Sequence, residues 1–462
     1  MILERIYEEK LAHASYIVGC GASGEALVID PNRNIDQYMK VAEAKGLRIV
    51  AIAETHIHAD YVSGSLELAR KTGATLYLSD EGGPDWKYDF PNAPFVQPVR
   101  DLDHFMVGNL KLEVMATPGH TPEHISFVLT DLPATSAPYG VFTGDFIFVG
   151  DVGRPDLLER AAGFEGTMER GAADLYQSIQ NFLTRFPDDI LLWPAHGAGS
   201  ACGKGLGGVP VSSLGYEKRT NPGLKQHTLA DFKEYVLQGQ PEPPAYFKHM
   251  KRINRIGPVA MAELDAPVQL QLPAMAAMSV LGTLVDTREA TTAKNGFLTG
   301  SLLIPESTSF TTWAGSLVRF DEPIYLISGS PQEAAEATLD LRMIGLDRVA
   351  GWVLSTELDS GACSSIQDVS AEHVLNRPDW QILDVRGQSE HDREHVPGAK
   401  HIPLGELASR LGELSTDEPI AVFCAAGTRS PMAASILVQN GFKQVYDLAG
   451  GFAEIATLPI AC

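Results

Sequence analysis

The sequence predicts an α/β protein that is divided into more than one domain. The chain has 462 residues, which is more than a single hydrophobic core usually organises. Over residues 1–258, short β-rich runs alternate with helical stretches. After that region the chain contains an internal repeat, whose matching segments are 96 to 98 residues apart. These three observations predict one α/β region followed by two copies of a smaller α/β module.

In the first region, strand-like apolar segments end in polar residues. The runs "RIVAIAETHIHAD" (48–60) and "MATPGHTPEH" (115–124) both carry histidines after their apolar residues. An α/β fold places its chemistry where apolar strands give way to polar loops, so we expect a functional site there. A Pro-rich passage (238–260) follows, and the sequence pattern changes after it. We therefore predict a first domain over residues 1–260, with a boundary near 258–268.

The repeat is clear in two pairs of segments. "LVDTRE" (284–289) returns as "ILDVRG" (382–387), and "EPIYLIS" (322–328) returns as "EPIAVFC" (418–424). Each copy reads as a buried strand, a loop and a helix in alternation, which is the pattern of an α/β module. We predict that the two copies cover residues 268–362 and 366–462.

Composition excludes several classes of partner. The net charge is −22, from 58 acidic and 36 basic residues, and it repels nucleic acid and anionic membranes. No apolar run is long enough to span a membrane, and the N-terminus lacks the apolar core of a signal peptide. The cysteines are odd in number and widely scattered, which indicates reduced thiols and a cytoplasmic location. They are Cys20, Cys202, Cys363, Cys424 and Cys462.

Four elements of the first region carry potential metal ligands. They are the run His56-x-His58-x-Asp60, followed by His120, Asp145 and His196. Imidazole and carboxylate groups suit divalent first-row metals, and each element follows a predicted strand. A single His-x-His pair is usually a surface feature, but four such elements in this order predict a metal centre.

This set resembles the metallo-β-lactamase superfamily, whose His-x-His-x-Asp-His motif is followed by separate His, Asp and His residues. The run "TGDFIFVGDVGRPDL" (143–157) is similar to the persulfide dioxygenase branch of that superfamily. The resemblance implies an αββα sandwich with metal at the strand ends. It also implies one Fe(II) per chain, held by His56, His120 and Asp145.

Tyr61 stands where the two-metal members of the superfamily have a histidine. A neutral phenol is a poor ligand beside an imidazole, so the second metal position should be weakened while the first is kept. Two histidines and one carboxylate leave three coordination positions open, as in non-haem Fe(II) oxygenases. Those positions would accept a persulfide sulfur together with O₂. We therefore expect a one-metal site.

The other polar residues of this region are expected to surround the metal. We assign His58, Asp60 and His196 to the pocket, where they would orient ligands or protonate oxygen species. For His196 the alternative is a vestigial zinc ligand without a chemical part. Arg154 is expected to brace the metal-bearing loop through Asp156 without a catalytic role.

The C-terminal copy carries a second chemical centre in "FCAAGTRSPMAA" (423–434). Cys424 follows an apolar strand, and small residues let successive backbone N–H groups turn towards its sulfur. Together with Arg429 and the N-terminus of the following helix, these groups favour a thiolate or a persulfide anion. The remaining loop residues are Ala425, Ala426, Gly427, Thr428 and Ser430.

This loop, with "DVR" (384–386) and "HVPGA" (395–399), resembles the rhodanese family of sulfurtransferases. The resemblance implies that Cys424 carries sulfane sulfur. In the first copy the aligned residue is Ser328, whose hydroxyl cannot hold transferable sulfur. That copy is predicted to be inactive as a transferase.

Two further features leave alternatives open. Cys202, six residues after His196, is either a relay thiol near the metal or a passive loop thiol, and we favour the second interpretation. The basic run "KHMKRINR" (248–255) is either a solvated helix face, which we favour, or a site for an anionic thiol carrier such as glutathione or coenzyme A.

Together the two resemblances imply a fused persulfide dioxygenase and sulfurtransferase of sulfide detoxification. It would oxidise glutathione or coenzyme A persulfide with O₂ to sulfite, and interconvert sulfite, persulfide and thiosulfate. A homo-oligomer is expected by analogy with the family. One alternative is a zinc-dependent thioester hydrolase of the glyoxalase II type with fused rhodanese modules. The other is a sulfur carrier whose metallo domain is a degenerate scaffold.

Overall fold

The computed structural model describes residues 1–90, 92–160, 166–273, 281–375 and 377–457. Cys462 lies outside these residues. The chain divides into two compact units, one of Met1–Leu264 with Arg342–Gly345 and one of Asp265–Leu341 with Leu346–Cys462. No helix in the described ranges is long and apolar enough to cross a membrane.

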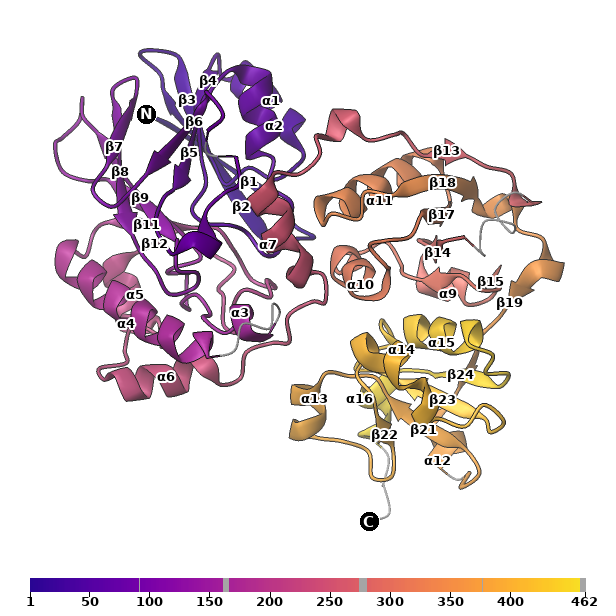
Figure 1. Cartoon of the computed structure of the whole chain (residues 1–462). Coiled ribbons are helices and arrows are strands. Elements are labelled where there is room, and N and C mark those ends of the chain that lie inside the picture. Colours follow the sequence, from indigo (N-terminus) through magenta and orange to yellow (C-terminus); the bar gives the residue numbers. More distant parts are fainter. Residues whose placement is uncertain (91, 161–165, 274–280, 376, 458–462) are drawn as a thin grey trace. The chain divides into compact units, whose positions relative to one another are not determined.

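The first unit is built on two six-stranded sheets that face each other (Figure 1). One sheet has the order β1-β2-β3-β4-β5-β6. Its strands are Ile2–Glu8, His13–Cys20, Glu25–Ile29, Arg48–Ala53, Thr75–Ser79 and Val96–Val99. The other sheet has the order β12-β11-β10-β9-β8-β7. From β7 to β12 its strands are His104–Val107, Leu110–Ala116, Ile125–Asp131, Gly140–Gly144, Leu191–Pro194 and Ser212–Ser213.

Helices cover the outer face of each sheet, which gives four layers. The helices α1 (Ile35–Ala44) and α2 (Ser65–Thr72) pack on the first sheet. The helices α4 (Thr167–Arg185), α5 (Leu214–Thr220) and α6 (Leu229–Leu237) pack on the second. The unit also contains η1 (Pro84–Trp86), α3 (Leu157–Arg160), α7 (Phe247–Ile256) and η2 (Met261–Glu263). The predicted αββα sandwich is confirmed.

Strands buried on both faces explain why the sandwich forms. Along β2, Tyr16 and Val18 point into the core between the sheets, whereas Ile17 packs under the helices. Along β9, Phe127 lies between the sheets and Val128 faces the α4 layer. Successive strand side chains point to opposite faces, so a run that is apolar at every position must be covered on both sides.

The second unit contains two five-stranded parallel sheets with the same connectivity. Their orders are β13-β18-β17-β14-β16 and β20-β24-β23-β21-β22, and a small ladder joins β15 to β19. The strands from β13 to β18 are Val268–Gln269, Thr283–Asp286, Phe297–Leu298, Leu302–Leu303, Ile324–Ser328 and Val349–Leu354. Those from β19 to β24 are Cys363–Ser364, Gln367–Val369, Gln381–Asp384, Lys400–His401, Ile420–Phe423 and Val445–Leu448.

Each sheet of the second unit has its own helices, as a right-handed crossover between parallel strands requires. The first module has α9 (Ala290–Ala293), α10 (Phe310–Leu317), α11 (Pro331–Met343), η3 (Ser355–Glu357) and η4 (Ser360–Ala362). The second has α12 (Ala371–Leu375), α13 (Gln388–Arg393), η5 (Leu404–Glu406), α14 (Leu407–Arg410), η6 (Leu411–Glu413), α15 (Ser430–Gln439) and α16 (Gly451–Ile455). The sequence repeat is therefore a repeat of structure.

Candidate metal centre and sulfur-binding loop

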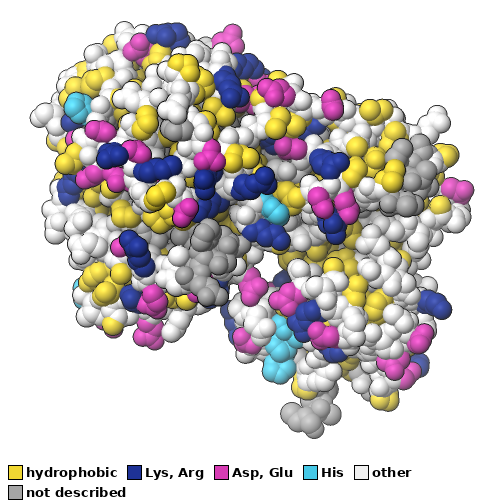
Figure 2. Space-filling model, viewed as in Figure 1, with side chains coloured by type: hydrophobic (Ala, Val, Ile, Leu, Met, Phe, Trp, Pro, Cys, Tyr) yellow, Lys and Arg dark blue, Asp and Glu magenta, His cyan; other side chains and the backbone are white. Residues whose placement is uncertain are grey.

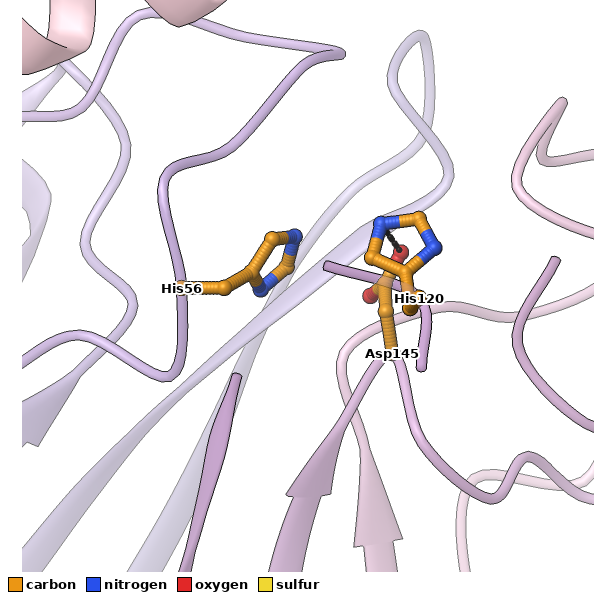
Figure 3. Close-up of side chains that lie close together, drawn as sticks. All are labelled: His56, His120 and Asp145. Atoms are coloured by element: carbon orange, nitrogen blue, oxygen red, sulfur yellow. Dashed lines mark ion pairs between the residues drawn. The ribbon is translucent and has the colours of Figure 1, made fainter. Parts of the chain in front are cut away.

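Three of the predicted metal ligands meet at one edge of the sandwich. His56, His120 and Asp145 follow the carboxyl ends of β4, β8 and β10, and one ligand atom from each lies within 4.8 Å of the others. All three residues are buried. Figure 3 shows the two imidazoles and the carboxylate directed towards one another. His120 Nε2 lies 3.5 Å from Asp145 Oδ2.

Hydrogen bonds turn the same nitrogen of both histidines towards this space. The Thr55 hydroxyl donates to Asp30 Oδ2 (2.9 Å), so its oxygen is left to accept from His56 Nδ1 (3.0 Å). His120 Nδ1 donates to the carbonyl oxygen of Arg154 (2.9 Å). In each ring Nε2 is therefore the nitrogen with a free lone pair, which is how outer partners prepare a histidine to bind a metal.

Asp145 is held by its backbone and leaves its carboxylate free for a cation. Its N–H donates to His124 Nε2 (3.0 Å), and burial lowers the pKa of His124 to about 3, so that ring is a neutral acceptor. Neither carboxylate oxygen of Asp145 has a hydrogen-bond partner among the described residues. A buried carboxylate without partners is costly unless a cation neutralises it. The three donors therefore fit a divalent metal ion.

Tyr61 and His58 lie outside this donor set. The Tyr61 hydroxyl donates to the Asp30 carbonyl oxygen (3.3 Å), and its ring lies 4.5 Å from the His58 ring. His58 Nε2 is 3.2 Å from a carboxylate oxygen of Asp30 and of Glu54. Burial alone lowers the pKa of His58, but the two carboxylates outweigh burial and raise it well above its ordinary value. His58 is thus placed as a cation between carboxylates.

A second donor set adjoins the first, although Tyr61 replaces one histidine of the two-metal motif. Ligand atoms of Asp60, His196 and Cys202 also lie within 4.8 Å of one another. His196 Nδ1 donates to the Ala12 carbonyl oxygen (3.0 Å), which leaves Nε2 at 3.3 Å from Asp60 Oδ2. The residue at position 61 therefore does not remove every donor for a second ion.

Cys202 is buried at this second set. Burial raises the pKa of its thiol well above the ordinary range, and the negative charges of Asp145 and Asp60 raise it further. The thiol is therefore protonated at neutral pH while these carboxylates stay uncompensated. The sequence placed Cys202 near the pocket but left open whether it acts as a relay.

Arg154 ties the metal-bearing loop to two other segments. Its guanidinium donates from Nε and Nη2 to the two carboxylate oxygens of Asp156, at 2.8 Å each. Its Nη1 donates to the carbonyl oxygens of Ala201 and Pro241, also at 2.8 Å. Because Arg154 also supplies the carbonyl that orients His120, the side chain braces the site and does not enter it.

Sequence reasoning missed the residues that hold the donors in place. They are His13, Asp30, Glu54, His124 and Asn254. His124 was within reach, because it ends the quoted "TPGHTPEH". Glu54 was also within reach, because it lies two residues before His56 in the quoted run 48–60. By contrast, His13, Asp30 and Asn254 come from distant segments and carry no local motif. His13 lies on β2 with its ring 4.1 Å from that of Tyr61, and Asn254 comes from α7.

The predicted sulfur-binding loop directs backbone N–H groups at the Cys424 sulfur. Cys424 is fully buried after β23, and its Sγ accepts from the N–H groups of Gly427 (3.2 Å) and Arg429 (3.3 Å). Ser430 Oγ lies 3.7 Å from the same sulfur at the start of α15. Gly427 has φ +82°, a left-handed conformation that side chains disfavour. Directed N–H groups at a helix N-terminus stabilise negative charge on sulfur.

The side chain of Arg429 has a partner that the sequence did not predict. Its guanidinium forms two hydrogen bonds with the Glu390 carboxylate, at 2.6 and 2.8 Å. The backbone N–H of Arg429 supports the Cys424 sulfur directly, and the guanidinium also interacts with that sulfur through its charge and a side-chain hydrogen bond. The same guanidinium ties the loop to α13 through Glu390.

The first module keeps the scaffold of this site but not the loop. Arg288 pairs with Asp286 (2.6 Å) and reaches a backbone carbonyl eight residues on, as Arg386 does with Asp384 (2.7 Å). Only two residues separate Ser328, at the end of β17, from α11, whereas five separate Cys424 from α15. The shorter loop lacks the residues whose backbone N–H groups surround the sulfur in the second module.

Comparisons with known proteins agree with this architecture. A family model described as the metallo-beta-lactamase superfamily matches residues 9–196, and one described as a rhodanese-like domain matches residues 369–458. A crystal structure of a metallo-beta-lactamase from Staphylococcus aureus is 40% identical, with a TM-score of 0.71. The alignment covers 76% of this chain and 99% of that one.

Two curated relatives each match less than half of this chain. A mitochondrial persulfide dioxygenase of Bos taurus is 29% identical over 229 residues, which are 48% of this chain and 76% of the relative. A hydroxyacylglutathione hydrolase of Polaromonas sp. is 31% identical over 200 residues, which are 42% of this chain and 66% of the relative.

Proposed function

The chain belongs to the metallo-β-lactamase superfamily and carries a C-terminal rhodanese-like domain, and on this basis we propose that it is a persulfide dioxygenase fused to a sulfurtransferase. The observation that carries the proposal is the buried donor set of His56, His120 and Asp145. Two imidazoles with one carboxylate suit Fe(II), and we propose one iron per chain. Similarity to a persulfide dioxygenase supports this choice of reaction.

The proposed reaction converts a low-molecular-weight persulfide, O₂ and water into a thiol and sulfite. The bond between the two sulfur atoms breaks, the terminal sulfur is oxidised to sulfite, and O₂ takes up the electrons. Iron, when bound, supplies the redox activation of O₂.

The surrounding side chains have distinct roles in this proposal. The Thr55 and Arg154 contacts hold the imidazoles of His56 and His120 in one tautomer. The His58 imidazolium is a proton-bearing group close to the donors, with its ring centre 4.3 Å from that of His56. It can donate a proton to an oxygen atom during the oxidation.

The proposed second step takes place at Cys424. The thiolate attacks the terminal sulfur of a persulfide, forms a cysteine persulfide and releases the carrier thiolate. Sulfite then attacks the outer sulfur, which yields thiosulfate and restores the Cys424 thiolate. The N–H groups of Gly427 and Arg429 support this step, because the sulfur carries negative charge at its beginning and at its end.

An oxygen electrode tests the first step. Full-length protein purified without oxygen should consume O₂ when glutathione persulfide is added, and one sulfite should form for each O₂ consumed. Absence of uptake by iron-loaded protein, together with hydrolysis of a glutathione thioester, would refute the proposal.

A second candidate function is favoured by the second donor set. Asp60, His196 and Cys202 could hold a second ion beside the first, and a hydroxyacylglutathione hydrolase is among the relatives. With two zinc ions, such a site would activate water for thioester hydrolysis. The same assay separates the two functions, because hydrolysis needs no O₂.

A further inference from the structure

The first unit has a basic groove along α7. It is lined from α7 by Lys248, Lys251, Arg252 and Arg255, and on the other side by Asp85 and Asp89, with a cavity of about 540 Å³. Figure 2 shows basic side chains gathered over the position that α7 occupies in Figure 1. Four cations against two carboxylates make a local positive excess in a chain of net charge −22.

Part of this positive charge has no ion-pair partner among the residues that the structure describes. Arg255 pairs with Asp89 (3.2 Å), and Lys251 Nζ lies 3.4 Å from the centre of the Trp86 ring. Lys248 and Arg252 are exposed and form no ion pair with any residue that the structure describes.

The spacing of Lys248 and Arg252 on α7 is unfavourable without an anion. These two exposed cations are four residues apart. Like charges at this spacing lie on one face of a helix and repel each other. An anion held between them would remove the repulsion. A solvated helix face would more commonly interleave opposite charges.

A buried residue next to one wall of the groove is hydrogen-bonded to the backbone of the metal ligand His56. Tyr88 is buried, and its hydroxyl donates to the carbonyl oxygen of His56 (3.2 Å). Its chain neighbour Asp89 lines the groove and donates its N–H to the Arg255 carbonyl oxygen (2.9 Å), which joins the two walls.

The other wall is held in the same way. Asn254, the chain neighbour of Arg255, donates from Nδ2 to the carbonyl oxygens of His58 and Tyr61, at 2.8 Å each. Its Oδ1 accepts from the N–H of Ser63 (2.9 Å). On each wall, a buried residue is hydrogen-bonded to the segment 56–63, which carries His56. The residue next to it in the chain lines the groove.

We propose that this groove binds the phosphate groups of the thiol that carries the persulfide sulfur. The inference rests on the proposed function and narrows its substrate to carriers of the coenzyme A type. Glutathione offers two carboxylates and a repelling ammonium group, whereas a phosphorylated carrier offers several negative charges. Lys and Arg bind phosphate oxygens strongly, and a groove joined to the donor loop would place the sulfur end of the carrier towards the metal.

Binding of the unreacted thiol tests the groove separately from the oxidation. Titration calorimetry of the full-length protein should show that coenzyme A binds at least about tenfold more tightly than pantetheine or glutathione, with an affinity that falls as salt is added. Equal affinity for coenzyme A and pantetheine would overturn the inference, because pantetheine lacks the nucleotide phosphates.

Two double variants, each of which removes two positive charges, locate the binding site. Lys248→Gln with Arg252→Gln should weaken coenzyme A binding about tenfold, since two cations near phosphate are lost. The control, Lys40→Gln with Lys225→Gln, removes two exposed cations elsewhere on the same unit and should leave binding unchanged. Equal weakening in both variants would mean a general charge effect and would overturn the inference.

Oxygen uptake separates this inference from the proposed function. The groove variant should raise KM for coenzyme A persulfide and leave kcat for glutathione persulfide unchanged. Adenosine diphosphate should compete with coenzyme A persulfide, whereas non-competitive inhibition would indicate a separate nucleotide site and contradict the inference. If glutathione persulfide is oxidised but coenzyme A does not bind, the inference fails and the proposed function stands.

Discussion

The metal centre and the Cys424 loop are assembled in opposite ways. The metal donors are side chains from separate strand ends, and residues from distant segments such as Asp30 and Asn254 hold the surrounding structure. The loop is one continuous segment, 424–430, that uses backbone N–H groups. The first site therefore depends on the long-range packing of the sandwich, whereas the second depends on loop length and on one glycine conformation.

Removing a metal ligand should separate the two centres most strongly. We expect His120→Ala to lose bound metal and to reduce oxygen uptake to background, because Asp145 then lacks a neighbouring donor. Sulfurtransferase activity should stay within about twofold of the parent, since the loop lies in another unit. His104→Ala, at an exposed position of β7, is the matched control. Loss of both activities would show that the centres are not independent.

Cys424→Ser should produce the reverse pattern. Transfer of sulfur between thiosulfate and a thiol acceptor should disappear, because a hydroxyl cannot carry sulfane sulfur, while oxygen uptake survives. Cys363→Ser, which alters a half-buried thiol of the same unit, should change neither assay. A fall in oxygen uptake with Cys424→Ser would mean that the two steps are catalytically linked.

Asn254→Ala tests whether the metal centre depends on distant packing. The substitution leaves two carbonyl oxygens and one N–H of the segment 58–63 without their partner. Unpaired buried groups of this kind cost about 1–3 kcal/mol each. We expect lower metal content and a lower free energy of unfolding of the first unit, with unchanged sulfurtransferase activity. Full metal content in this variant would contradict the expectation.

The smallest expected effect is that of the Glu123 carboxyl group on stability. Its titration should make the free energy of unfolding depend on pH. Burial raises the pKa of Glu123 to about 7, and its Oε1 accepts from the Ile57 N–H (2.9 Å). Between about pH 4.5 and 7 the folded state keeps a proton that the unfolded state has lost. The free energy of unfolding therefore falls as pH rises through this window, by up to about 3 kcal/mol.

Glu123→Gln removes this titration and retains an oxygen that can accept from Ile57. Urea unfolding across pH 5 to 8 should show the variant gaining stability relative to the parent as pH rises. Parallel curves for the two proteins would mean that Glu123 does not titrate in this range.

The sequence was most informative where function depends on neighbouring residues. The Cys424 loop is one short segment, so its cradle follows from small residues placed before a helix. The repeat was visible because both copies keep the Asp-x-Arg pair, and the structure shows that each pair forms the same ion pair. The αββα sandwich required the family resemblance, because alternating segments alone do not specify how sheets pair.

The surroundings of the metal were less predictable for a physical reason. Asp30 and Asn254 are 26 residues before and 198 residues after His56, and only the folded chain brings them to the donor loop. Likewise, the absence of a histidine at position 61 suggested that the second site was weakened. Position 61 is one position of the motif, and Cys202 joins Asp60 and His196 from another loop.

Metal analysis of the full-length protein purified without oxygen tests the central claim most directly. The account predicts about one iron per chain, which is lost in Asp145→Ala, because this carboxylate completes the set with His56 and His120. Two zinc ions per chain, or iron that Asp145→Ala retains in full, would contradict it.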